Sequence, residues 1–269
     1  MVDDAISTPM WRRMYAASLS ERRGWMSLVS MSWLNDGEIA LLRYRSAKQG
    51  EPLGTVTRLG DALVVTKSAG KRITVNGSAV RTWELTSDID GTPDLIEAGP
   101  DTWAFIKRGE RFGLRGWNVD HGRGLAQTGL RWAPLRPQLN FLAKWVPYSK
   151  PRMVTIVNVL GQRTPTPMHG YAEFRVDGRL YRLEGTGTPE IGKVFFNFRD
   201  ATCNTVAYQP GRFLDAEFSP TGRIRLDFNR AYNPPCAYTS FATCPLPHKQ
   251  NILKVAIPAG ELRFPGHKH

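Results

Sequence analysis

The sequence predicts a mainly β protein, either an antiparallel barrel (a calycin-like one included) or a two-layer sandwich, with an N-terminal helical pair. Glycine (25 residues) and proline (19 residues) are frequent, which suits short strands joined by turns better than a helical bundle. Apolar and polar residues alternate over much of the chain after Leu53, whereas helical spacing is confined to the first fifty residues. The 269 residues are expected to form one compact unit from three segments: 1–50, 51–150 and 151–269.

The first segment carries the helical patterns. Ser7 and Thr8 are typical helix caps, and Pro9 follows in the first turn, where its missing N–H costs nothing. Apolar residues then recur at helical spacing, and Arg12 falls among the polar residues expected to face solvent. A second apolar run, residues 25–34, is expected to form the second helix and ends before Asn-Asp-Gly.

The middle segment is expected to be a meander of short strands. Asn76-Gly77 and Gly109-Glu110 each separate two strand-like runs, which predicts two hairpins. The sequence His-Gly-Arg-Gly at 121–124 is expected to start a loop, because glycine disfavours regular structure. Residues 133–151 are spaced by prolines and are expected to form a connector with one short apolar anchor. A soft boundary is placed near Pro151.

The last segment shows the clearest strand patterns. Hairpins are predicted about Asp177-Gly178 and about residues 220–222, with a buried strand over residues 194–200 between them. The second hairpin has one apolar face, and opposite charges on its other face. Residues 251–262 are expected to supply a closing strand. The apolar face consists of Leu214, Ala216, Phe218, Ile224, Leu226 and Phe228.

Composition narrows the classes of function. The formal charge is +12, but no block of like charges and no common nucleic-acid-binding signature occurs, so nucleic acid is not the expected partner. No run of eighteen apolar residues occurs, and the acidic N-terminus does not resemble a signal peptide. A cytoplasmic protein without a membrane span is therefore expected. The chain has three cysteines, an odd number, which fits the cytoplasm and does not suggest a disulfide framework.

Several stretches resemble one uncharacterised bacterial and archaeal family, catalogued as domain of unknown function 1684. They are WRRMYAASLSERRGWMSLVSMSWLNDGE, RGERFGLRGW, FNFRDAT, YQPGRFLDAEF and LDFNRAYNPPCAYTSFATCPLPHKQNILKVAIPAGE. The resemblance implies a shared fold unit and a shared site, but no settled reaction. In one loop this chain departs from the family, which typically has Thr-Asn-Gly before Thr-Tyr. The chain instead has Cys203 and Asn204 within residues 202–208, so a turn glycine is lost.

The end of the last of these stretches contains residues that could bind a metal or form a disulfide. Cys236, Cys244 and His248 have the spacing Cys-x7-Cys-x3-His, whereas structural zinc sites use pairs two to four residues apart, so no metal is expected. A Cys236–Cys244 disulfide and two buried reduced thiols both remain open, with Cys244 favoured as a buried apolar residue. No histidine lies close to Cys236 in sequence, and neither Gly-x-Ser-x-Gly nor a phosphate-binding glycine loop occurs. No cofactor is expected.

Polar residues gather at the strand ends of the last segment. One hypothesis is a rigid corner, since Asn233 precedes Pro234-Pro235 and must be extended. The other is a pocket for a small oxygen-rich or anionic organic molecule, in which a cofactor-free enzyme of the proton-transfer, lyase, cyclase, isomerase or hydrolase type acts. A non-catalytic binding module and a protein held to an acidic partner by charge are the alternatives. The predicted catalytic residues are Asp200, Asp227 and Tyr232, and the predicted substrate-binding residues are Tyr208, Arg212, Asn229, Arg230, Asn233 and Cys236.

Overall fold

The protein is described from a computed structural model, which covers residues 6–45 and 52–266. The chain divides into two compact units. Met1–Tyr15 and Thr128–His269 form the first, here called the barrel unit, and Ala16–Gln127 forms the second, here called the two-sheet unit. The segment 1–50 therefore contributes to both units, and the division at 127/128 differs from the soft boundary placed near Pro151.

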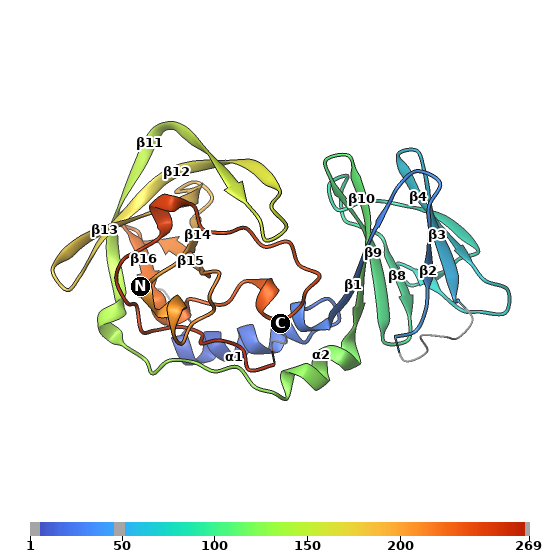
Figure 1. Cartoon of the computed structure of the whole chain (residues 1–269), viewed down its shortest axis with the longest axis horizontal. Helices are drawn as coiled ribbons and strands as arrows, with labels where there is room; N and C mark the ends of the chain where they lie inside the picture. Colours follow the sequence, from blue (N-terminus) through green and yellow to red (C-terminus); the bar gives the residue numbers. More distant parts are fainter. Residues whose placement is uncertain (1–5, 46–51, 267–269) are drawn as a thin grey trace. The chain divides into compact units, whose positions relative to one another are not determined.

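The barrel unit is built on a closed antiparallel barrel in the order β11-β12-β13-β14-β15-β16 (Figure 1). Pairing between β16 and β11 closes it, with Asp227 opposite Asn140 and Ile224 opposite Ala143. The mainly β class and its barrel form are thus confirmed. The strands are β11 (Asn140–Val157), β12 (Arg163–Val176), β13 (Arg179–Thr188), β14 (Lys193–Phe198), β15 (Arg212–Phe218) and β16 (Ile224–Asp227).

Apolar side chains fill the interior of the barrel. The predicted apolar face of the β15–β16 hairpin is confirmed, because five of its six residues belong to this core and Phe218 packs against it. Phenylalanine rings from β12, β14 and the end of β16 meet there, with the Phe174 and Phe228 centroids 5.5 Å apart. A small barrel is expected to be filled by its own side chains. A pocket lined by polar residues must therefore lie elsewhere in this unit.

The two-sheet unit contains two antiparallel sheets. One has the order β1-β10-β9-β8-β5-β6 and the other the order β2-β3-β4-β7, and a core cluster draws residues from both. The strands are β1 (Leu28–Leu34), β2 (Ile39–Leu42), β3 (Gly54–Leu59), β4 (Ala62–Lys67), β5 (Thr74–Val75), β6 (Ser78–Ala79), β7 (Thr82–Leu85), β8 (Leu95–Ala98), β9 (Asp101–Arg108) and β10 (Arg111–Asn118).

The predicted tight turns are confirmed by their backbone angles. Asn76 and Gly77 have φ values of 50° and 81°, and Asp177 and Gly178 have 49° and 77°. Positive φ at both central positions is what a two-residue hairpin of the right twist requires. Gly109 likewise joins β9 to β10 with φ of 58°.

The N-terminal helix is confirmed, and its partner is not. Helix α1 (Thr8–Leu19) begins where predicted, and the Ser7 hydroxyl accepts a hydrogen bond from the Met10 N–H. Residues 25–34, expected to be helical, instead form the short 3-10 turn η1 (Trp25–Ser27) and then β1. Pairing of β1 with β10 decides this, because an apolar run of this length suits a strand as well as a helix.

Residues 121–124 lie in helix α2 (Val119–Ala126), not in a loop. The Asn118 side chain caps the helix by accepting a hydrogen bond from the His121 N–H at 2.8 Å. A Cβ on Gly122 would lie 2.0 Å from the Ser27 hydroxyl, so this glycine permits close packing. Tertiary contact therefore overrides the low helix propensity of glycine here.

Two further expectations near the barrel are wrong. Residues 133–151 are not a mere connector: after the 3-10 turn η2 (Pro137–Leu139), β11 runs through Pro151. Residues 251–262 do not form a closing strand, since they make only isolated bridges, such as Arg199 with Ile252. Closure comes from β16 on β11 instead. Among the described helices, none is long and apolar enough to cross a bilayer.

Candidate functional site

Asp200, predicted to be catalytic, and Arg212, predicted to bind substrate, form a fully buried ion pair. Asp200 follows β14 and caps the 3-10 turn η3 (Ala201–Asn204), accepting hydrogen bonds from the Thr202 N–H and hydroxyl at 2.9 and 2.7 Å. Arg212 opens β15 and donates to Asp200 Oδ2 and to the Ile257 and Ala259 carbonyls. The Arg212 side chain is 1% exposed and the Asp200 side chain is 0% exposed. Such bonding offsets the cost of burying two charges, and it favours a structural role for the pair.

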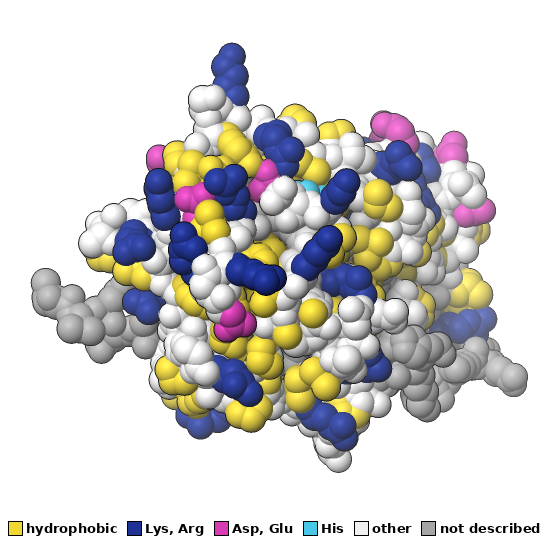
Figure 2. Space-filling model, turned by 60° about the vertical axis from the view of Figure 1, so that its left-hand side comes forward, with side chains coloured by type: hydrophobic (Ala, Val, Ile, Leu, Met, Phe, Trp, Pro, Cys, Tyr) yellow, Lys and Arg dark blue, Asp and Glu magenta, His cyan; other side chains and the backbone are white. Residues whose placement is uncertain are grey.

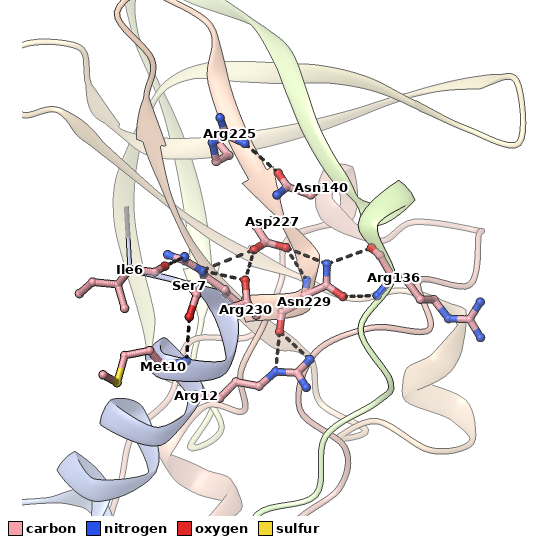
Figure 3. A network of polar contacts seen from close by, with 11 residues as sticks. Ile6, Ser7, Met10, Arg12, Arg136, Asn140, Arg225, Asp227, Asn229 and Arg230 are labelled. Carbon is pink, nitrogen blue, oxygen red and sulfur yellow. Dashed lines mark hydrogen bonds and ion pairs between the residues drawn. The ribbon is translucent and has the colours of Figure 1, made fainter. Parts of the chain in front are cut away.

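Asp227 and Arg230 lie in a different polar network (Figure 3). Asp227 caps the 3-10 turn η4 (Phe228–Arg230), and its Oδ1 accepts from the Asn229 N–H at 3.1 Å. Its Oδ2 accepts from the Thr8 hydroxyl at 2.7 Å and lies 3.4 Å from Arg230 Nε. Arg230 also donates to the carbonyl of Ile6. The network ties the start of α1 to the end of β16.

Asn229 extends this network to two other segments. Its carbonyl accepts from Arg12 Nε and Nη2 at 3.2 and 3.0 Å (Figure 3). Arg12 also donates to Ala133 and lies over the Trp132 ring, so the expectation that it faces solvent is wrong. The Asn229 side chain accepts from the Arg136 N–H at 2.8 Å and donates to the Arg136 carbonyl at 3.0 Å. Every polar atom named here serves to hold chain segments together.

Tyr232 and Asn233 belong to a third cluster. The Tyr232 hydroxyl donates to Asp215 at 2.7 Å, and its ring lies 5.1 Å from that of Tyr15. The Asn233 N–H donates to Glu261 Oε2 at 2.8 Å. Glu261 also accepts from the Tyr238 hydroxyl at 2.6 and 2.7 Å, and burial raises its pKa to about 7.

Cys236 and Cys244 face each other as reduced thiols. The Cys236 N–H donates to Cys244 Sγ at 3.1 Å, and the Cys244 N–H donates to Cys236 Sγ at 3.4 Å. The hydrogen bond from Cys244 lowers the pKa of Cys236, whereas burial raises the pKa of nearby Tyr208. All three cysteines are buried, and none of them forms a disulfide. Within the described ranges, no group of three His, Cys, Asp or Glu side chains is placed to hold a metal ion.

A cavity of about 240 Å³ lies on the outer side of β13 and β14, and none of the nine predicted site residues lines it. Side chains alternate along these strands, so that Leu183 and Phe196 enter the core while Glu184 and Asn197 point the other way. Residues 245–251, in red in Figure 1, complete the wall. The lining residues are Ile156, Thr166, Met168, Glu184, Thr186, Phe195, Asn197, Pro245, His248 and Asn251.

Glu184 is the buried carboxylate of this cavity, with its side chain 4% exposed. The Tyr148 hydroxyl and Arg152 Nη2 both donate to it. Its backbone is clamped by Asn251, which accepts from the Glu184 N–H at 2.8 Å and donates to the Glu184 carbonyl at 2.8 Å. Asn251 also donates to the Asn197 carbonyl at 2.9 Å, so one amide fixes two strands of the cavity wall.

His248 lies beside Glu184, with Nε2 3.4 Å from Oε2 and a side chain 9% exposed. Burial lowers the pKa of His248, which the neighbouring Glu184 partly opposes. Nε2 makes no hydrogen bond of good geometry with the described residues, and neither does the buried Oδ1 of Asn197. The Asn197 amide is oriented by its donation to the Pro245 carbonyl at 3.0 Å. Two buried polar atoms thus lack a partner in one cavity, a condition that calls for a ligand or water.

Sequence reasoning missed this cavity because its residues carry no local signal. Glu184 reads as an ordinary strand residue, and Asn251 is 67 residues further along the chain. His248 was considered only as a zinc ligand with the cysteines. The nearest available signal was the stretch Pro-Leu-Pro-His, where prolines fix a polar side chain against a sheet.

The fold and this cavity define a small filled β-barrel with a largely apolar pocket, which holds a few polar groups, on its outer face. The chain belongs to the family described as Protein of unknown function (DUF1684), whose sequence profile matches residues 126–262. The matched range contains the whole barrel and every residue of the cavity.

Among the solved structures that match the chain is the solution NMR structure of an uncharacterized protein from Haloarcula marismortui. It is 28% identical to this chain, covers 52% of this chain and 78% of its own, and has a TM-score of 0.42. No curated protein matches the chain.

Proposed function

We propose that the barrel unit binds a small anionic, oxygen-rich organic molecule in the cavity beside Glu184 and His248, and moves a proton on it using only its own side chains. The observation that supports this proposal is the pair of unpartnered polar atoms, Asn197 Oδ1 and His248 Nε2, in one largely apolar cavity. Ligand sites commonly combine an apolar wall with a few placed polar groups.

His248 is the proton acceptor in this proposal. Because burial lowers its pKa below the ordinary 6.5, the imidazole is neutral at pH 7 and able to take a proton. Glu184, 3.4 Å away, stabilises the imidazolium that results. Asn197 Oδ1 accepts a hydrogen bond from a hydroxyl or enol of the ligand.

Arg152 supplies the positive charge that an anionic ligand needs. It uses Nη2 to hold Glu184, its side chain is 51% exposed, and a guanidinium has further N–H donors for a carboxylate. Lys249, next to His248, lines a neighbouring groove together with Arg182 and Lys254. On the face shown in Figure 2, dark blue Lys and Arg side chains clearly outnumber magenta Asp and Glu ones. The positive electrostatic potential of such a surface attracts anions.

A non-catalytic binding module is the second candidate. The apolar part of the lining favours it, since Ile156, Met168 and Phe195 provide contact area without chemistry. Glu184 is also fully engaged by Tyr148 and Arg152, which suits a rigid binding wall.

Hydrogen–deuterium exchange separates the two candidates. Acetoacetate, levulinate and 2-oxobutyrate are incubated with the protein in D2O, and NMR follows loss of the protons next to their carbonyls. The wild type is expected to accelerate exchange, and His248→Gln to lower the rate by about 100-fold or more, as for loss of a general base. His121→Gln, in the other unit, is the matched control and should exchange like the wild type.

The same samples give the remaining outcomes. Ligand-observed NMR reports whether each acid binds. Binding without exchange would support the non-catalytic module. Absence of binding by every acid, or exchange that survives His248→Gln, would contradict the proposed site.

A further inference from the structure

The two-sheet unit contains its own cavity, which lies outside the residues matched by the family profile. Its volume is about 300 Å³, the lower end of the range of small-molecule sites. Strands β1, β2, β9 and β10 bound it, together with the three residues after β2. The lining residues are Val29, Ser30, Ser32, Ala40, Leu41, Arg43, Tyr44, Arg45, Asp101, Trp103, Leu114 and Trp117.

Small residues on β1 and β10 make room for this cavity. Gly116 pairs with Ser30 on one side and with Trp103 on the other. A Cβ on Gly116 would lie 2.3 Å from Ser30 Oγ and 2.8 Å from Trp103 Cδ1. The indole of Trp103 therefore rests directly on the β10 backbone, which only glycine permits here.

A buried carboxylate lies in this wall. Asp101 is 2% exposed, and its Oδ1 accepts from Asn118 Nδ2 at 2.8 Å. Its Oδ2 accepts from the Arg45 N–H at only 3.4 Å, a long bond that leaves acceptor capacity. Burial raises the pKa of Asp101. A carboxylate in so dry a place needs a good donor to offset its desolvation.

Two arginines also line the cavity. Arg43 and Arg45 carry two positive charges, and Asp101 carries one negative charge. The side chains that line the cavity therefore have a net positive charge.

We propose that this cavity binds a sugar acid, a small molecule with several hydroxyl groups and one carboxylate. Arg43 and Arg45 bind the carboxylate, for which the guanidinium is a matched fork. Asp101 accepts a hydrogen bond from a hydroxyl of the sugar acid. The faces of Trp103 and Tyr44 cover the C–H side of the sugar ring.

Three probes and three variants test this site by isothermal titration calorimetry on the full chain. Glucuronate is expected to bind; glucose, without the carboxylate, and benzoate, without the hydroxyls, are each expected to bind at least about tenfold more weakly. Asp101→Asn and Arg43→Gln are each expected to weaken glucuronate binding about tenfold or more. Arg81→Gln, at an exposed arginine of the same unit that lies outside the cavity, is the matched control and should leave glucuronate binding unchanged.

Arg43→Gln keeps the test valid if Asp101→Asn fails to fold, because Arg43 is only half-buried. Thermal melting of each variant separates loss of binding from loss of folding. The proposal is overturned if glucuronate does not bind, if glucose or benzoate binds as tightly, or if the folded Arg43 variant binds like the wild type. Loss of glucuronate binding in Arg81→Gln would mean that the loss in Arg43→Gln is not specific to this cavity, and it would overturn the proposal as well.

Discussion

Glu261→Gln should remove a pH-dependent cost of folding in the barrel unit. Glu261 is 0% exposed. Its carboxyl group accepts hydrogen bonds from the Asn233 N–H and the Tyr238 hydroxyl. Burial raises its pKa from 4.5 to about 7, although these bonds lower it in part. Glutamine keeps the shape and one carbonyl acceptor but has no ionisable proton.

The magnitude follows from the two pKa values. The difference between 4.5 and about 7 corresponds to about 3 kcal/mol. The unfolded chain releases this proton near pH 4.5, whereas the folded chain keeps it up to about pH 7. Stability is therefore greatest below pH 4.5 and falls by about 3 kcal/mol as the pH rises to 7, after which this contribution is constant.

Urea unfolding at pH 4.5, 6 and 8, followed by tryptophan fluorescence, measures this effect. The free energy of unfolding of Glu261→Gln minus that of the wild type should grow by about 3 kcal/mol across the series. Comparing the two proteins at each pH cancels the histidines and other common titrating groups. Exposed Glu217→Gln, on β15, is the matched control and should show no such growth. If the difference in free energy of unfolding between Glu261→Gln and the wild type is the same at all three pH values, Glu261 does not have a raised pKa in the folded protein.

Three further predictions follow from the barrel unit. Phe228→Ala should lower the free energy of unfolding by about 3–5 kcal/mol, because the ring is fully buried in the barrel core; an unchanged urea midpoint would contradict this. Asp227→Ala should loosen α1 through loss of the Thr8 bond and the η4 cap, seen as faster amide exchange at residues 8–15 with little change in β13. The three buried cysteines should react with a thiol reagent only as fast as the protein unfolds, and rapid labelling of the native protein would disprove their burial.

The predictable part of the fold was the part fixed by local chemistry. Asn76-Gly77 and Asp177-Gly178 demand positive φ wherever they occur, so their hairpins follow from sequence alone. The β15–β16 face was predictable because alternation over two strands admits one register. The run 25–34 was not, since only its pairing with β10 selects a strand.

The polar corner was found, but its use was not predictable. Polar residues between Asp227 and Asn233 bond to buried peptide groups and to neighbouring segments, as Asn229 does to Arg12 and Arg136. Glu184 and His248 come from distant parts of the chain and meet only after the barrel forms. Nothing in the spacing of these two residues indicates their contact.

Titration of the His248 imidazole measures whether this side chain can act as the base of the barrel cavity. Protein with 15N-labelled histidine rings is followed by NMR from pH 5 to 8, and His248→Gln identifies the His248 signals. The ring is expected to be neutral at pH 7, with a pKa below 6.5, and its signals are expected to shift when acetoacetate is added. Glu184→Gln should lower that pKa further, because the carboxylate raises it. The proposed role of His248 would be contradicted if its ring titrates above pH 6.5. It would also be contradicted if its signals do not change when an acid that binds the protein is added.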